Sequence, residues 1–169
     1  MTSTSTSTSE NMSDLREKLN RVRICMFTTS DSTGGLTSHP MALQDAEDED
    51  CLWFFTAAHT KLACDVPASP NVNLSFADPS DSLYVSVSGR AELVEDRARM
   101  AKLWNPMVAA WFPKGLDDPE LRLVKVDPHG AEFWDSSSSR MVQLLKMAKA
   151  AVTGTTPRTD PGEHGTLRL

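Results

Sequence analysis

The sequence predicts an α+β domain in which about six antiparallel strands form a small barrel and a few short helices fill the gaps. Runs of apolar, β-prone residues recur along the chain, with turn-rich segments between them. The helical stretches are short and begin at capping residues. With 169 residues, of which 40% are hydrophobic and 24% charged, the chain is long enough for one domain with a real core.

The two ends of the chain differ from its middle. Residues 1–12 begin with alternating Thr and Ser and offer little to bury, so we expect a disordered tail there. Residues 154–169 carry Gly, Pro, Thr and charged residues and are expected to form a flexible tail. The folded domain is therefore predicted at 13–153.

The strands are predicted from apolar runs bounded by turn residues. Pro40 confines the second run to a sheet edge or a bulge, because proline has no amide hydrogen to donate. Gly89 allows the longest run to bend, and the acidic run 45–50 is expected to be a solvated hairpin tip. The predicted strands are 24–29, 36–43, 51–56, 72–76, 83–94, 121–126 and 131–134.

Helices are predicted where a capping residue precedes an apolar stripe at helical spacing. Proline after such a stripe marks the expected end of the helix. The predicted helices are one that opens at Ser13, one at 60–66 before Pro67, one at 97–104 between Asp96 and Asn105-Pro106, and one with the stripe Met141, Leu144, Leu145, Ala148 and Ala151.

Charge and composition exclude several classes of protein. The net charge of −6 is opposite to that of a dedicated nucleic-acid binder, and no apolar run approaches the ~18–20 residues of a membrane span. The N-terminus lacks the basic and apolar segments of a secretory signal. We therefore expect a soluble, cytoplasmic protein with no nucleic-acid or membrane partner.

The chemistry-bearing residues form no familiar catalytic or metal motif. The four histidines occur singly, and the three cysteines form no CxxC pair, so we expect no metal site and three structural thiols. The sequence contains no GxSxG, HExxH, P-loop or GxGxxG pattern. We therefore assign no catalytic acid or base.

Two segments could bind a ligand. A buried strand that ends at Thr56 leads into a helix that begins with Thr60 and Lys61, a pattern suited to an anion because helix amides, hydroxyls and an ammonium group converge. A helix cap with an exposed lysine is the alternative for this pattern. Trp111 and Phe112 put a bulky apolar face into a predicted loop, where they suit core packing, an interface or a planar ligand.

Several motifs together resemble a known family. The chain is similar to the general stress protein 26 family, a branch of the pyridoxamine 5′-phosphate oxidase-like flavin-binding split barrels, from about residue 15 to residue 154. Each motif alone is unspecific, whereas their order and spacing are fairly specific. The motifs are TSHPM at 37–41, LWFFT at 52–56 with Lys61 after it, YVSVSGRAE at 84–92, LWNP at 103–106, AWFPKG at 110–115 and EFWD at 132–135.

The resemblance implies a six-stranded antiparallel split β-barrel homodimer that binds FMN, with FAD as the other flavin, in a groove between subunits. The strand around Pro40 would run along the flavin, Phe55 and Thr56 would line the ribityl–phosphate side, and Thr60 with Lys61 would hold the phosphate. The cofactor-binding residues that the resemblance implies are His39, Pro40, Met41, Phe55, Thr56, Thr60, Lys61, Trp111 as an aromatic wall, and Trp134 from the other subunit.

Three positions depart from the family pattern. His39 stands where the family usually has arginine before Pro-Met, and Tyr84 stands where the oxidases place a glutamine. The arginine that the oxidases carry about ten residues after the Trp134 equivalent is missing, since the nearest basic residue is Arg140. We therefore do not expect oxidation of vitamin B6.

The function expected from the resemblance is that of a flavin-binding stress-response protein, acting as a flavin-dependent oxidoreductase on an unknown substrate. One alternative is a deazaflavin-dependent reductase on the same barrel. The other is a non-enzymatic flavin- or haem-binding module, in which His39, His59 or His129 would serve as the axial ligand of a haem.

Overall fold

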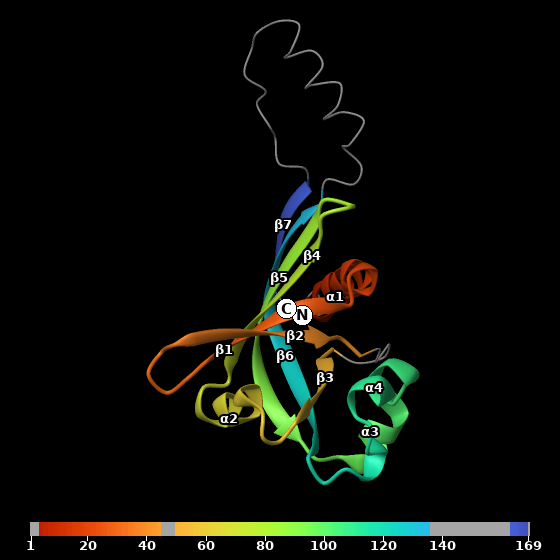
Figure 1. Cartoon of the computed structure of the whole chain (residues 1–169). Helices are drawn as coiled ribbons and strands as arrows, with labels where there is room; N and C mark the ends of the chain where they lie inside the picture. Colours follow the sequence, from red (N-terminus) through yellow and green to blue (C-terminus); the bar gives the residue numbers. More distant parts are fainter. Residues whose placement is uncertain (1–3, 45–49, 136–162, 169) are drawn as a thin grey trace, which may run out of the picture.

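The computed structural model describes residues 4–44, 50–135 and 163–168 of the chain. The described part contains a curled antiparallel sheet with short helices packed around it (Figure 1). Its elements are α1 (Thr4–Arg21), β1 (Ile24–Ser30), β2 (Leu36–Ala42), β3 (Leu52–Ala57), α2 (Lys61–Ala68), β4 (Asn71–Asp78), β5 (Leu83–Val94), α3 (Arg97–Leu103), α4 (Pro106–Trp111), the 3₁₀ turn η1 (Gly115–Asp117), β6 (Leu121–Asp135) and β7 (Glu163–Arg168).

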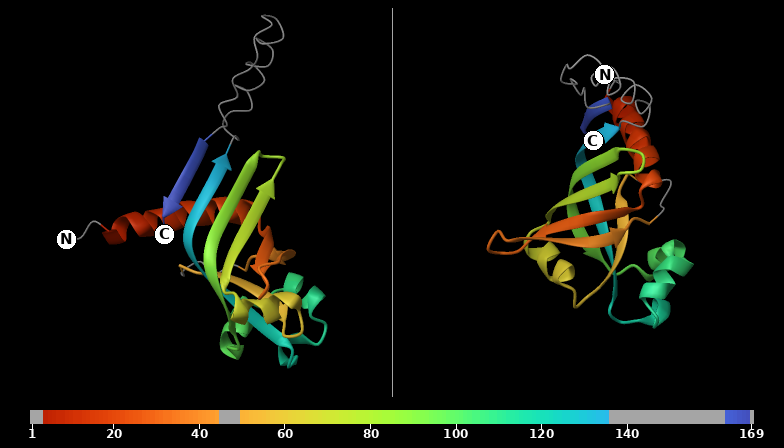
Figure 2. Two further views of the ribbon diagram at one scale, coloured as in Figure 1. Left: turned by 90° about the vertical axis from the view of Figure 1, so that its left-hand side faces the viewer. Right: turned by 45° about the horizontal axis from the view of Figure 1, so that its top comes forward.

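The sheet confirms the predicted six-stranded antiparallel architecture. Its strand order is β2-β1-β4-β5-β6-β3, and β7 adds to β6 beside this path. The two ends of the path approach each other, because Gln44 just after β2 forms an isolated bridge with Trp53 in β3. The sheet thus curls into a half-barrel (Figure 2). Pro40 lies on β2, the edge strand that its missing amide hydrogen predicts.

Two apolar clusters account for the burial of both faces of β3. Phe54 faces the barrel interior, where its ring meets that of Phe27 edge-on with 5.3 Å between the centroids. Phe55, on the opposite face, packs beneath α3 and α4 with Trp104 and Phe112. Because helices cover its outer face, β3 is a continuous apolar run and does not alternate.

The helices differ from their predicted bounds in three places. The backbone of α1 is helical from Thr4, within the segment expected to be a disordered tail, and Leu15 and Leu19 anchor the helix in the core. Pro67 lies inside α2 and not after it, in the last turn, which closes with the Ser69 amide on the Asp65 carbonyl. Trp111, expected in a loop with Phe112, is the last residue of helix α4, a helix that was not predicted from the sequence.

The strands at 121–126 and 131–134 were predicted separately, but they are one strand, β6. Gly89 on β5 makes this continuity feasible. The register of β5 against β6 shifts at Ser88/Gly89, and a Cβ at Gly89 would lie 2.7 Å from Val126 Cγ1. This irregularity falls at the glycine where the sequence predicts a bend.

Two predicted features cannot be compared with the structure. The tip of the acidic hairpin at 45–49 and the C-terminal helix around 141–151 lie outside the described residues. Part of the expected flexible C-terminal tail is described, and it forms β7. A search of the described helices finds none with the length and hydropathy needed to cross a bilayer.

Candidate functional site

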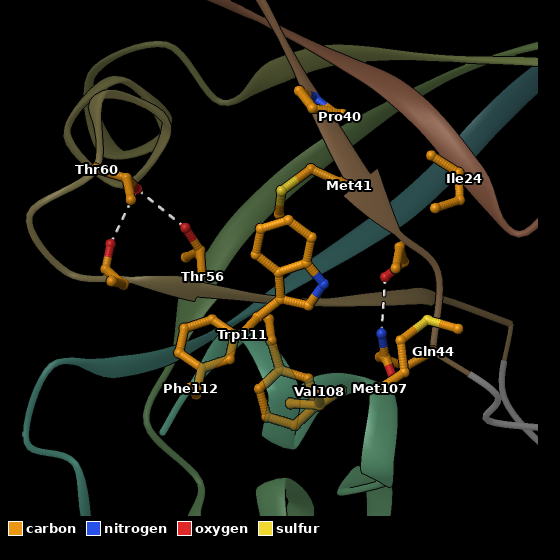
Figure 3. A pocket seen from close by; sticks show the side chains of 13 residues that line it. Ile24, Pro40, Met41, Gln44, Thr56, Thr60, Met107, Val108, Trp111 and Phe112 are labelled. Atoms are coloured by element: carbon orange, nitrogen blue, oxygen red, sulfur yellow. Dashed lines mark hydrogen bonds between the residues drawn. The ribbon is translucent and has the colours of Figure 1, made fainter. Parts of the chain in front are cut away.

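A pocket of about 370 Å³ opens where the end of β2, the end of β3 and helix α4 meet (Figure 3). This volume lies within the usual range for small-molecule sites. Ten of its 13 lining residues are apolar and none carries a charge. The lining residues are Ile24, Pro40, Met41, Ala42, Gln44, Phe55, Thr56, Ala57, Thr60, Met107, Val108, Trp111 and Phe112.

Helix α4 forms one wall of the pocket, and its position is fixed by its N-cap. The Asn105 side-chain oxygen accepts hydrogen bonds from the amides of Met107 and Val108, at 3.0 and 3.1 Å. The Asn105 amide group donates to Gln44 Oε1 at 2.8 Å. Gln44 follows β2 and is itself 8% exposed, so one polar contact joins the two walls.

The apolar wall is open to solvent. Trp111 is 79% exposed and Met107 58% exposed, although both line the pocket. Figure 3 shows the indole of Trp111 extending from α4 toward Met41 on β2. An aromatic side chain this exposed beside a hollow provides a flat surface that a planar ligand or a partner protein would cover.

The polar end of the pocket is formed by two hydroxyl groups. Thr60 is the N-cap of α2, and its Oγ1 accepts from the Ala63 amide at 3.2 Å and donates to the Ala57 carbonyl at 2.9 Å. Thr56 Oγ1 lies 2.9 Å from Thr60 Oγ1 (Figure 3). The N-terminus of α2, with its positive dipole end, therefore lies at this end of the pocket.

The ammonium group of Lys61 lies beside the carboxylates of Asp31 and Asp65. We call these three residues, together with Thr29, which binds Asp65, the α2 corner. Lys61 Nζ is 2.8 and 3.0 Å from the two carboxylate oxygens of Asp65 and 3.8 Å from Asp31 Oδ2. The hydrogen bond to Asp65 raises the pKa of Lys61, and the same bond lowers the pKa of Asp65. All three groups are ionised at neutral pH.

The pocket brings together six of the nine predicted cofactor-binding residues: Pro40, Met41, Phe55, Thr56, Thr60 and Trp111. His39 and Lys61 are outside the lining, although each is adjacent in sequence to a residue that belongs to it. Trp134 lies at the opposite end of β6 from the segment paired with β3, beside Tyr84 and His164. The role of each residue in binding a cofactor stays a prediction.

Seven of the lining residues are not among the predicted cofactor-binding residues, although Phe112 was named with Trp111 as part of an apolar face. For two of these residues the sequence contains a pattern that predicts their position. Asn-Pro marks a helix start as well as a stop, which would have placed Met107 and Val108 on a helix wall. Gln44 gave no signal, because its role depends on a contact with a residue 61 positions away. The seven residues are Ile24, Ala42, Gln44, Ala57, Met107, Val108 and Phe112.

The chemistry of the pocket is that of binding. No lining residue titrates near neutral pH, and among the described residues no group of three or more His, Cys, Asp or Glu side chains could hold a metal ion. Burial raises the pKa of Cys25 to about 12, so this thiol stays protonated. The arrangement can surround a flat, mostly apolar ligand and offers hydroxyl groups at one end.

Comparisons with known proteins find relatives of this chain. A bli-3 protein from Neurospora crassa is 29% identical over 155 residues, which is 86% of this chain and 74% of that protein. A structure described as a general stress protein 26 from Jannaschia sp. CCS1 superposes with a TM-score of 0.72 and 31% identity over 93% of this chain and 99% of that one.

A general stress FMN/FAD-binding protein from Xanthomonas citri matches with a TM-score of 0.65 and 28% identity, over 75% of this chain and 89% of that one. The family model described as pyridoxamine 5′-phosphate oxidase like matches residues 10–158. The chain therefore belongs to the pyridoxamine 5′-phosphate oxidase-like family of split-barrel proteins and is similar to its general stress protein 26 members.

Proposed function

We propose that this protein binds a flavin, with FMN as the first candidate and FAD as the second. The ring system would lie in the pocket between β2, β3 and α4. The observation that carries the proposal is an open, uncharged pocket with an exposed tryptophan wall, in a chain whose family includes a relative described as FMN/FAD binding. A flat aromatic ring fills such a pocket and covers the apolar surface that is now exposed.

The side chains that line the pocket match the successive parts of a flavin, from the ring system to the sugar-like chain. Met41, Phe55 and Trp111 offer apolar contact to a ring system. Gln44, whose side-chain amide is hydrogen-bonded to Ala42 and Asn105, would lie near its polar edge. Thr56 and Thr60 lie where the sugar-like chain would leave the pocket, toward the N-terminus of α2 and Lys61. When the ligand is FMN, its phosphate would lie nearest to Lys61.

The proposed activity is that of a flavin-dependent oxidoreductase. A bound flavin supplies hydride and electron transfer. The chain's part is to position the ring, exclude water from one face and admit a substrate at the open side beside Trp111. No described residue of the pocket is suited to act as a general acid or base, so substrates that need proton transfer would obtain it from solvent.

We also propose that the protein is a homodimer whose second subunit brings Trp134 toward the flavin. Supporting this, one face of the sheet exposes apolar side chains that a partner would bury. Ile24 is 57% exposed, Leu36 75% and Tyr84 45%. Light scattering on the purified protein should give twice the chain mass, and the chain mass alone would contradict the dimer.

The test is a titration of the purified protein with FMN, followed by tryptophan fluorescence, together with a visible absorbance scan. Saturable quenching at micromolar FMN supports the proposal, and a similar response to FAD would extend it to both flavins. The absence of quenching by either would reject it. Binding of a deazaflavin or haem instead, each with its own visible band, would favour the corresponding alternative, although no histidine lines the described pocket.

A further inference from the structure

In the α2 corner, the ammonium group that would bind an anion already contacts two carboxylates of the same chain. Lys61 Nζ contacts both oxygens of Asp65, at 2.8 and 3.0 Å, in an i,i+4 pair on α2. Asp31, in the turn between β1 and β2, lies 3.8 Å away on another side. Two negative charges therefore face one positive charge at the end of the pocket where a phosphate would lie.

Neither carboxylate depends on Lys61 for its position. Asp65 has a side chain that is only 9% exposed and accepts a buried hydrogen bond from Thr29 Oγ1 at 3.0 Å. Asp31 Oδ1 accepts from the Thr33 hydroxyl at 2.7 Å and from the amides of Gly35 and Thr33, each at 2.9 Å, and these contacts lower its pKa. Both carboxylates thus keep their positions if Lys61 turns toward a ligand.

The other polar side chains near the N-terminus of α2 also have hydrogen-bond partners within the chain. Thr60 Oγ1 already makes three contacts, to Ala57, Ala63 and Thr56. Arg122, which pairs in register with Thr56, binds Glu95 Oε1 at 2.8 Å and two backbone carbonyls. The nearby cations Lys61 and Arg122 therefore face three carboxylates, Asp31, Asp65 and Glu95.

A phosphate dianion would meet a net negative corner. Lys61 has three N–H donors and can contact a phosphate while it stays bonded to Asp65, but Asp65 and Asp31 then share the same ammonium group and repel the phosphate. A neutral ligand meets no such opposition, because the pocket lining is uncharged. The geometry therefore favours recognition of the ring over recognition of the phosphate.

We propose that this pocket selects flavins by their ring system, so that riboflavin binds nearly as well as FMN, and that Asp65 and Asp31 are the residues that set this weak preference. The inference rests on the proposed flavin site and names its ligand class more narrowly, as the flavin ring with a neutral side chain. It also assigns Asp65 and Asp31 a role in ligand choice that their helix and turn positions alone do not indicate.

The experiment compares riboflavin with FMN by flavin fluorescence titration of the full-length protein in low-salt buffer. We expect the two dissociation constants to agree within about threefold. The variant Asp65→Asn keeps an oxygen to accept from Thr29 but removes one charge, so FMN should bind about five- to tenfold more tightly while riboflavin is unchanged. Added salt should reduce this gain.

A matched control exists on α1, where Lys18 Nζ binds Asp14 at 2.9 Å in another i,i+4 pair. Asp14→Asn makes the same change in net charge and should leave both affinities unaltered. Asp31→Asn is the second variant, since its oxygen can still accept from Thr33 and Gly35 if Asp65→Asn destabilises the fold. It should shift FMN in the same direction by a smaller factor, because Asp31 is farther from Lys61.

Each outcome decides between the claims. FMN affinity more than about 30-fold above that of riboflavin in the wild type would overturn the inference and leave the flavin site standing. A gain for Asp14→Asn equal to that for Asp65→Asn would also overturn it, because only net charge would then matter. Failure of both flavins to bind the wild type would reject the proposed function and the inference with it.

Discussion

The pocket and the α2 corner lie side by side and contrast in every property that governs binding. The pocket is uncharged, and its aromatic wall at Trp111 is exposed to solvent. In the α2 corner, by contrast, the ammonium and carboxylate groups already have partners within the chain. A ligand gains most by covering apolar surface that is exposed and least by displacing contacts that are already made. The difference indicates that the site binds its ligand mainly through the flavin ring and little through the phosphate.

Removal of the aromatic wall is the largest expected effect on binding. Trp111→Ala should weaken FMN and riboflavin alike by about tenfold, equivalent to ~1.4 kcal/mol, because both present the same ring to the indole. Fluorescence titration measures both constants. Trp111→Phe keeps an aromatic face and should retain most of the affinity. A loss of affinity confined to FMN would place Trp111 near the phosphate and would contradict the assignment of the ring to this pocket.

Removal of the lysine tests the other region. Lys61→Ala leaves Asp31 and Asp65 without their cation, so FMN should bind about fivefold more weakly while riboflavin changes little. The same titrations measure the effect, and Lys61→Arg, which keeps the charge, is the control. Equal losses for both ligands would remove Lys61 from any role near the phosphate.

The hydroxyl between the two regions has a structural role that can be measured apart from binding. Thr60 caps α2, so Thr60→Ala should lower the free energy of unfolding by about 1 kcal/mol. Urea denaturation measures this change, and Thr60→Ser should restore most of the stability because its hydroxyl can cap the same amide. Wild-type stability in Thr60→Ala would show that the cap contributes nothing.

The two regions should also differ in their response to acid. The folded pKa of Asp65 and that of Asp31 lie below the usual Asp value of about 3.9. Their contribution to stability is therefore complete above about pH 4 and is lost as the pH falls through the lowered values. The thermal midpoint should decline below pH 4, and less steeply in Asp65→Asn. Trp111→Ala, which removes no charge, should keep the wild-type profile, and a flattened profile there would contradict this assignment.

Local pattern was enough to predict the sheet. The apolar runs at β1, β3 and β5 are bounded by turns, and strand formation there depends mostly on residues close in sequence. Helix α4 was missed because Asn105-Pro106 ends one helix and caps the next, and the sequence was interpreted only as a stop. The continuity of β6 depends on its contact with Gly89 of β5, which no local pattern reveals.

The candidate site shows the same limit. Thr56, Thr60 and Trp111 were predicted, since each belongs to a short motif. Lys61 and Asp65 stand four residues apart in the sequence, a spacing that places a carboxylate beside the ammonium group on a helix. Asp31 could not be foreseen beside Lys61, because the turn between β1 and β2 brings it there from 30 positions away.

A crystal structure grown with riboflavin tests the central claim most directly, because it locates the ring without involving a phosphate. The account predicts the ring among Met41, Phe55 and Trp111, with Lys61 still bonded to Asp65. Riboflavin bound elsewhere, or Lys61 turned away from Asp65 toward the ligand, would contradict it.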